Sequence, residues 1–167
     1  MVEDKGKMKT EWTILKFNGD YKSLEDALKK KAEPYEVIKI DGNLLLNEGI
    51  NTLWTLVCGG SATNFSNGNA YIGVGDSNAA ESATQTGLQG TNKAYKGMDS
   101  GYPTYGSAQK ATWQATFGSN EANFTWNEIT VANGNSDSAM NLNRKVQSMG
   151  TKASGTTWVV QVSITLS

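Results

Sequence analysis

The most regular pattern of hydrophobic and polar positions lies in residues 158–167, at the end of the chain. Apolar and polar side chains alternate there almost without exception, and one face collects the apolar ones: Trp158, Val160, Val162, Ile164 and Leu166. A period of two residues is typical of a β-strand with one face buried and the other in solvent. The pattern therefore predicts a half-buried strand that continues to the last residue.

Shorter patterns of the same kind recur after residue 70 and predict an all-β body. The clearest segments are 71–75, 111–117 and 124–131. Loops rich in Gly, Asn, Ser and Thr separate them, and the long loops 76–92 and 97–108 are of the kind that usually carries function or contacts. We expect a mainly β fold, with an antiparallel β-sandwich or barrel-like body. Its core is expected to hold four tryptophans: Trp54, Trp113, Trp126 and Trp158.

The first 43 residues follow a different pattern, which predicts a small α/β element. Residues 12–17 and 35–40 are expected to form strands, and Ser23 begins a capping box that opens a short helix through about Lys31. A unit of this size has too small a core to be stable alone, so it should pack on the rest of the chain or on a neighbour. The expected organisation is an extended arm (1–10), a strand–helix–strand element (11–43) and a β-sandwich body with a leading helix (44–167).

The leading helix is expected over residues 47–58, as the one additional helix of the fold. Asn47 is the predicted N-cap, and two glycines follow the segment and end it. An apolar stripe at helical spacing is expected to face the core: Ile50, Leu53, Trp54 and Val57.

The chain has no histidine and a single cysteine, which excludes several classes of chemistry. Histidine is the commonest general base and metal ligand, and a Ser-His-Asp triad cannot form without it. One cysteine forms no internal disulfide and no thiolate metal cluster, and Cys58 is expected to be a small buried residue. We expect no catalytic residues, no cofactor and no bound metal.

The charges are nearly balanced, with a formal net charge of −1, and they concentrate in residues 1–50. This balance gives no electrostatic reason to expect binding to nucleic acid or to an anionic membrane. Residues 1–7 contain no apolar stretch, and no run approaches the ~20 apolar residues that span a bilayer. We expect a protein without a signal peptide that is made in the cytoplasm.

Two short motifs resemble ligand sites, but their residues are better explained by backbone features, namely close strand packing or a bulge in one case and a turn in the other. A Gly-Val-Gly at 73–75 follows an apolar run, yet no helix with apolar periodicity comes after it, so we expect close packing or a bulge there and no bound nucleotide. Residues 133–137 place oxygen atoms at alternate positions, as a calcium loop does. Ser138 stands where that loop needs glycine and Arg144 where it needs glutamate, so the segment predicts a turn.

Three acids of the β region are candidates for a role: Asp76, Asp99 and Glu128. A glycosidase needs two facing carboxylates, and no spacing in the sequence predicts such a pair. Glu128 interrupts an apolar strand face, so we expect it to be partly buried and paired with Arg144 in a structural ion pair.

Aromatic residues gather in the loop segments between 95 and 105, where the sequence has Tyr95, Tyr102, Pro103 and Tyr105. Tyrosine is enriched at protein interfaces, and tyrosine clusters also stack against sugars. Few positive charges lie nearby, which favours a protein interface made by these four residues.

Six short blocks occur in order within residues 44–167. They are 45–51, 70–76, 85–88, the aromatic strands around Phe117 and 126–128, 143–144, and the terminal 158–166. Together they resemble small virion proteins of tailed phages and prophages, a group that includes tail-fibre and collar-type proteins and head-associated proteins. The resemblance carries no catalytic residues, and it does not extend to residues 1–43.

The resemblance implies a non-enzymatic structural protein of the virion. The leading expectation is a capsid decoration (cement) protein that is made in the host cytoplasm and binds the outer head lattice through the major capsid protein or another virion protein. We expect a homo-oligomer, and a trimer because capsid lattices offer three-fold positions, with residues 1–10 extending onto a capsid subunit. A tail-fibre, collar or baseplate component and, in another class, a carbohydrate-binding module are the alternatives.

Overall fold

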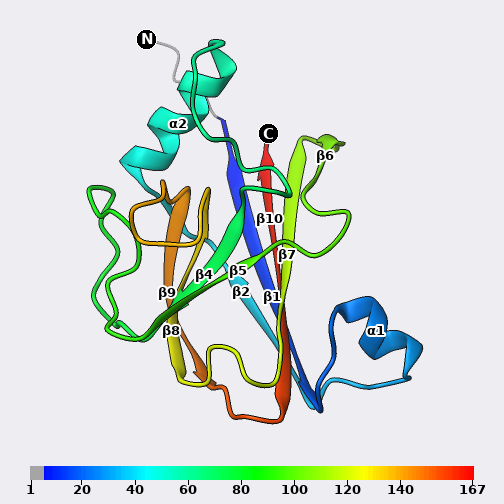
Figure 1. The fold of residues 1–167 in the computed structure, drawn as a ribbon. Coiled ribbons are helices and arrows are strands. Elements are labelled where there is room, and N and C mark those ends of the chain that lie inside the picture. Colours follow the sequence, from blue (N-terminus) through cyan, green and yellow to red (C-terminus); the bar gives the residue numbers. More distant parts are fainter. Residues whose placement is uncertain (1–5) are drawn as a thin grey trace.

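The strand expected at the end of the chain lies in the middle of the first of two sheets in the computed structural model, which describes residues 6–167 (Figure 1). This strand, β10, is central because it pairs with β1 on one side and with β7 on the other. The sheet is antiparallel and has the order β2-β1-β10-β7-β6. Its strands are β1 (Met8–Asn18), β2 (Glu36–Asp41), β6 (Thr104–Ser107), β7 (Lys110–Phe117) and β10 (Thr156–Leu166).

The second sheet is also antiparallel and has five strands, in the order β3-β9-β8-β4-β5. They are β3 (Leu44–Leu45), β4 (Tyr71–Gly75), β5 (Lys93–Gly97), β8 (Thr125–Ala132) and β9 (Asn143–Thr151). The two sheets face each other (Figure 1), and the mainly β sandwich expected from the sequence is confirmed.

The core lies between the sheets and is built from the apolar faces of the alternating strands. The Trp126 ring packs edge-on against Phe117, with ring centres 4.8 Å apart, and against Trp158, with ring centres 4.7 Å apart. These contacts tie β8 of one sheet to β7 and β10 of the other. Trp113, Trp126 and Trp158 are buried, as expected.

The N-terminal element packs on the rest of the chain, as its small size predicted. β1 pairs with β10 over its whole length, from Met8 opposite Leu166 to Asn18 opposite Thr156. The expected arm over residues 1–10 needs a correction, because residues 8–10 already belong to β1, where the backbone of β10 gives them partners. Residues 1–5 of that arm lie outside the described part of the chain.

Helix α1 (Leu24–Lys29) begins at the predicted cap, where the backbone N–H of Asp26 donates to Ser23 Oγ at 3.1 Å. The helix covers part of the outer face of the first sheet, beside a second apolar cluster formed by Phe17, Ala27 and Val159. The strand–helix–strand element therefore buries a small apolar cluster on the outer face of the first sheet.

Helix α2 (Asn47–Val57) has nearly the expected bounds, but the face that it buries is not the apolar face expected from the sequence. Its buried residues are Gly49 and Thr52, and Leu46 is its N-cap in place of Asn47. This face is buried because the helix backbone approaches the backbone of the body closely at Gly49. A Cβ on Gly49 would lie 2.5 Å from Leu142 Cα. The face with the smallest side chains is the one that fits against the sandwich.

The apolar stripe of α2 consequently points outward, which corrects the expectation that it faces the core. Trp54 is 63% exposed and Val57 73% exposed, and Leu53 is exposed as well. Cys58, expected to be buried, follows the helix and is also exposed. Among residues 6–167, no helix is long and apolar enough to cross a membrane.

Candidate functional site

The long loop 76–92 is held in place by a buried ion pair between Glu128 on β8 and Arg144 on β9. Arg144 Nε donates to Glu128 Oε2 at 2.8 Å, and both side chains are fully buried. The predicted pairing of these residues is therefore confirmed. Each partner also binds the loop: Glu128 accepts from the backbone N–H groups of Gln89 and Gly90, and Arg144 Nη1 donates to the carbonyl of Ala79.

The glycines at 73–75 make room for these contacts, and the predicted close packing is confirmed. A Cβ on Gly75 would lie 2.3 Å from Glu128 Oε1, and one on Gly73 would lie 2.7 Å from the Tyr95 ring. The Gly-Val-Gly motif therefore allows a carboxylate and an aromatic ring to lie directly against β4.

The other two candidate acids also organise loops. Asp76 accepts from the backbone N–H groups of Thr91 and Asn92, which closes the two ends of the loop 76–92 on each other. Asp99 Oδ2 accepts from Gln114 Nε2 at 2.9 Å and from Thr116 Oγ1 at 2.7 Å, which ties the loop after β5 to β7. The acids of the β region thus fix the shape of its long loops.

The four predicted interface residues do not share one exposed patch. Tyr95, on β5, donates its hydroxyl to Asp137 Oδ1, and burial together with this carboxylate raises the pKa of Tyr95 far above its ordinary value. Tyr102 accepts from Gln161 Nε2, and Tyr102 and Pro103 are half-buried. Of the four, all in the described part of the chain, Tyr105 alone is exposed, on the edge strand β6. Proximity in sequence thus does not make these four side chains equally exposed, and their role at an interface stays a prediction.

Residues 133–138 form the expected turn, and their side chains join neighbouring segments. Asn133 Nδ2 donates to the carbonyl of Thr63 at 2.8 Å, and Asn133 Oδ1 accepts from the N–H of Met140. Asp137 forms an ion pair with Lys93 at 2.5 Å. Within residues 6–167, no group of three His, Cys, Asp or Glu side chains is placed to hold a metal ion.

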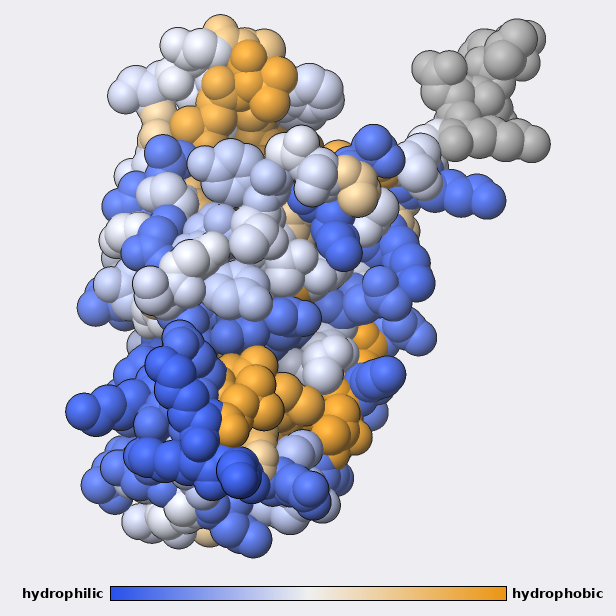
Figure 2. Space-filling view, turned by 90° about the vertical axis from the view of Figure 1, so that its right-hand side faces the viewer, coloured by the Kyte–Doolittle hydropathy of each residue, from blue (hydrophilic) through white to orange (hydrophobic). Residues whose placement is uncertain are grey.

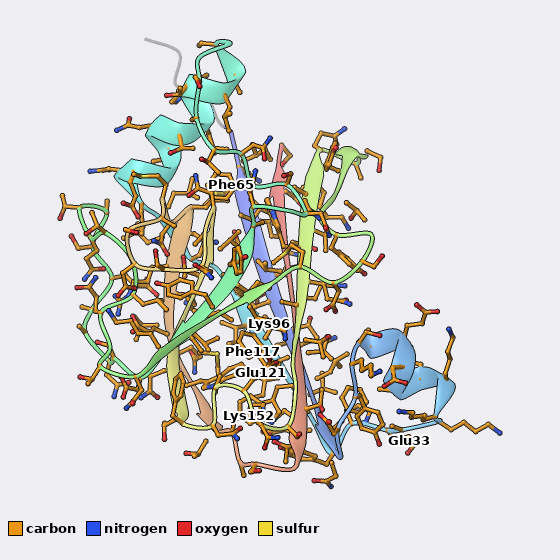
Figure 3. All side chains as sticks on the ribbon, in the orientation of Figure 1. Glu33, Phe65, Lys96, Phe117, Glu121 and Lys152 are labelled. Carbon is orange, nitrogen blue, oxygen red and sulfur yellow. The ribbon has the colours of Figure 1, made fainter. Side chains whose placement is uncertain are left out.

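A buried lysine lies at the end of the sandwich opposite α2, near the ion pair of Lys96 and Glu121 (Figure 3). Lys152 Nζ donates to the carbonyl of Gly118 at 2.7 Å and to Asn123 Oδ1 at 2.9 Å. Burial lowers the pKa of Lys152 to about 8. The side chain clamps the loop between β7 and β8, and nothing in the sequence predicted its burial.

An apolar groove opens at the other end of the sandwich, beside α2. Its volume is about 480 Å³. The lining comes from the ends of both sheets, from the β6–β7 turn and from the helix. Its larger apolar side chains are Met8, Leu45, Leu53, Trp113, Leu142, Ile164 and Leu166. Lys110 is the only charged residue among the described residues that line it.

The groove and the exposed stripe of α2 form one apolar surface, which we call the α2 end. Figure 2 shows apolar side chains at the end of the molecule where α2 lies, and a second apolar patch in the lower half of the same face. Leu53 belongs to both parts, since it lines the groove and is itself exposed on the helix. Large contiguous apolar patches on a protein surface mark sites of interaction, which makes the α2 end the candidate functional site.

Sequence reasoning missed this surface because it assigned the stripe of α2 to the core. One signal was present: Gly49 lies inside the predicted helix, where a glycine usually has a packing reason. No family model, curated protein or solved structure matches the chain.

Proposed function

We propose that this chain is a non-enzymatic structural protein of a tailed-phage virion, and specifically a capsid decoration protein. The observation that carries the proposal is the α2 end, an exposed apolar helix stripe beside an apolar groove, because such a surface marks a protein that assembles with other protein surfaces, copies of itself included. The resemblance of residues 44–167 to small virion proteins supports the choice of partner, which is the major capsid protein or another protein of the particle. The protein is made in the host cytoplasm and ends in the virion.

Rigid loops suit this role, because a surface that is already ordered loses little entropy when it binds. The loop 76–92 is closed by Asp76 and anchored by the buried pair of Glu128 and Arg144. The loops after β5 and β8 are tied down by Asp99 and Asp137. A molecule built in this way binds the particle with a surface that is already ordered, and shape complementarity provides the specificity.

The copy number of the protein in purified virions tests the proposal. We expect hundreds of copies per particle, counted by quantitative mass spectrometry against the major capsid protein. A dozen copies or fewer would contradict decoration and support the tail-fibre, collar or baseplate alternative. Absence from purified virions would refute the structural role altogether.

A further inference from the structure

Within residues 6–167, most of the apolar stripe of α2 is left exposed to solvent. Leu53, Trp54 and Val57 lie on adjacent turns of one helix face, and Trp54 and Val57 expose most of their surface. The single charged residue of the helix, Glu48, is turned toward the body, where its Oε1 accepts from the backbone N–H of Asn141 at 2.7 Å. The outward face therefore offers a tryptophan and two aliphatic side chains without a charge to desolvate.

The groove beside the helix is the matching depression. At about 480 Å³ it is large enough to receive an aromatic side chain with part of its helix. Its rim is also apolar, because Met8 and Leu166 are exposed there at 39% and 59%. Apolar surface that continues past the rim suits a macromolecular partner better than a small molecule, which would leave it in water.

We infer that the occupant of this groove is α2 of a second copy of the chain. An amphipathic helix that lays its apolar face in an apolar groove is a recurrent mode of recognition. Here one chain provides both parts, and both are nearly free of charge. The inference rests on the proposed function, since it names the contact through which copies of the decoration protein bind each other.

The area available is sufficient for such a contact. The exposed parts of Leu53, Trp54, Val57, Met8 and Leu166 come to roughly 500 Å² per copy, so mutual burial removes about 1,000 Å² in total, near the lower limit for a specific interface. Buried tryptophans at the centre of an interface commonly dominate its energy, which assigns the leading role to Trp54. Because each α2 enters the groove of the other copy, the contact has two-fold symmetry and gives a dimer in place of the trimer expected from the sequence.

Sedimentation velocity of the purified full chain from ~1 to ~100 μM tests the contact. We expect the wild type to associate as concentration rises. Trp54→Glu removes the projecting side chain, and Ser107→Trp introduces a large side chain into the groove from the exposed last residue of β6. Each variant should associate at least tenfold more weakly than the wild type. Leu28→Glu is the matched control, because Leu28 is 60% exposed on α1, away from the α2 end, and should associate like the wild type.

Mixing the two variants provides a sharper result. Trp54→Glu keeps an open groove and Ser107→Trp keeps an intact α2, so a mixed pair retains one helix-in-groove contact and should form more readily than pairs of either variant alone, but less readily than pairs of the wild type. Circular dichroism and thermal unfolding of each variant check that the fold is retained.

Two outcomes would overturn the inference. One is a wild type that stays monomeric at every concentration, and the other is association that neither variant weakens. The copy number in virions is a separate measurement, so a monomeric protein that still decorates capsids would refute the copy-to-copy contact and leave the proposed function standing.

Discussion

Replacing Glu128 with glutamine should destabilise the whole sandwich, because it leaves Arg144 as a buried cation without a counter-charge. Both side chains are fully buried and their charged atoms are 2.8 Å apart. Removal of one partner of such a pair costs about 3–5 kcal/mol. For a chain of this size, each kcal/mol lowers Tm by about 2–4 °C, so we expect a decrease of roughly 10 °C.

The loop makes this ion pair different from an isolated one. Replacing both members of a buried pair by apolar residues often restores stability. Here Glu128 also accepts from the N–H groups of Gln89 and Gly90, and Arg144 donates to Ala79. The double variant Glu128→Leu/Arg144→Met would leave these backbone groups without partners, so it should stay clearly less stable than the wild type.

Urea unfolding combined with hydrogen exchange measures both effects. The single variant should lose stability, and the amides of Gln89 and Gly90 should exchange faster in both variants. Glu11→Gln serves as the matched control, since Glu11 forms an exposed pair with Lys9 and its loss should leave stability and loop exchange unchanged. A loss below about 1 kcal/mol in Glu128→Gln, or unchanged exchange of the loop, would refute this account of the pair.

Two further predictions concern α2 and the buried lysine. Gly49→Ala should destabilise the protein by about 1–3 kcal/mol in urea unfolding despite the better helix propensity of alanine, because the new Cβ would lie 2.5 Å from Leu142 backbone atoms. Gly68→Ala is the control, because its Cβ would meet no atom of residues 6–167 within 4 Å. Equal stability of the two variants would contradict the packing described for α2. Lys152 has a pKa of about 8 in the fold and 10.5 as its ordinary value, so the folded state binds fewer protons between these values and stability should rise with pH. The rise from pH 8 to 10 should be about 2 kcal/mol larger in the wild type than in Lys152→Met, and identical pH profiles would show that Lys152 keeps an ordinary pKa.

The sequence predicted the elements whose side chains face the core and missed those whose orientation depends on a distant backbone. The alternation in residues 158–167 located β10 because one face of that strand has to be apolar. Glu128 was predicted to pair because a charge on a buried strand face needs a partner. Helix periodicity shows that a face of α2 is apolar, but which face packs against the sandwich is decided by the close approach of Gly49 to the backbone of Leu142, where any Cβ would clash.

The interface predicted from Tyr95, Tyr102, Pro103 and Tyr105 illustrates the same difference. Neighbours in a loop can point to different elements, and here the Tyr95 hydroxyl binds Asp137 while Tyr105 lies on the edge strand β6. The burial of Lys152 could not be predicted from the sequence. Its partners are the carbonyl of Gly118 and the side chain of Asn123, and no pattern of charged residues indicates such uncharged partners.

Addition of the purified protein to expanded capsids that lack it, followed by cryo-electron microscopy, shows whether the protein decorates the head. We expect extra density at regular positions of the outer head lattice, with the sandwich fold recognisable and α2 at a contact. Capsids that remain bare at saturating protein would contradict the claim, and density confined to the tail would assign the protein to the other class of virion component.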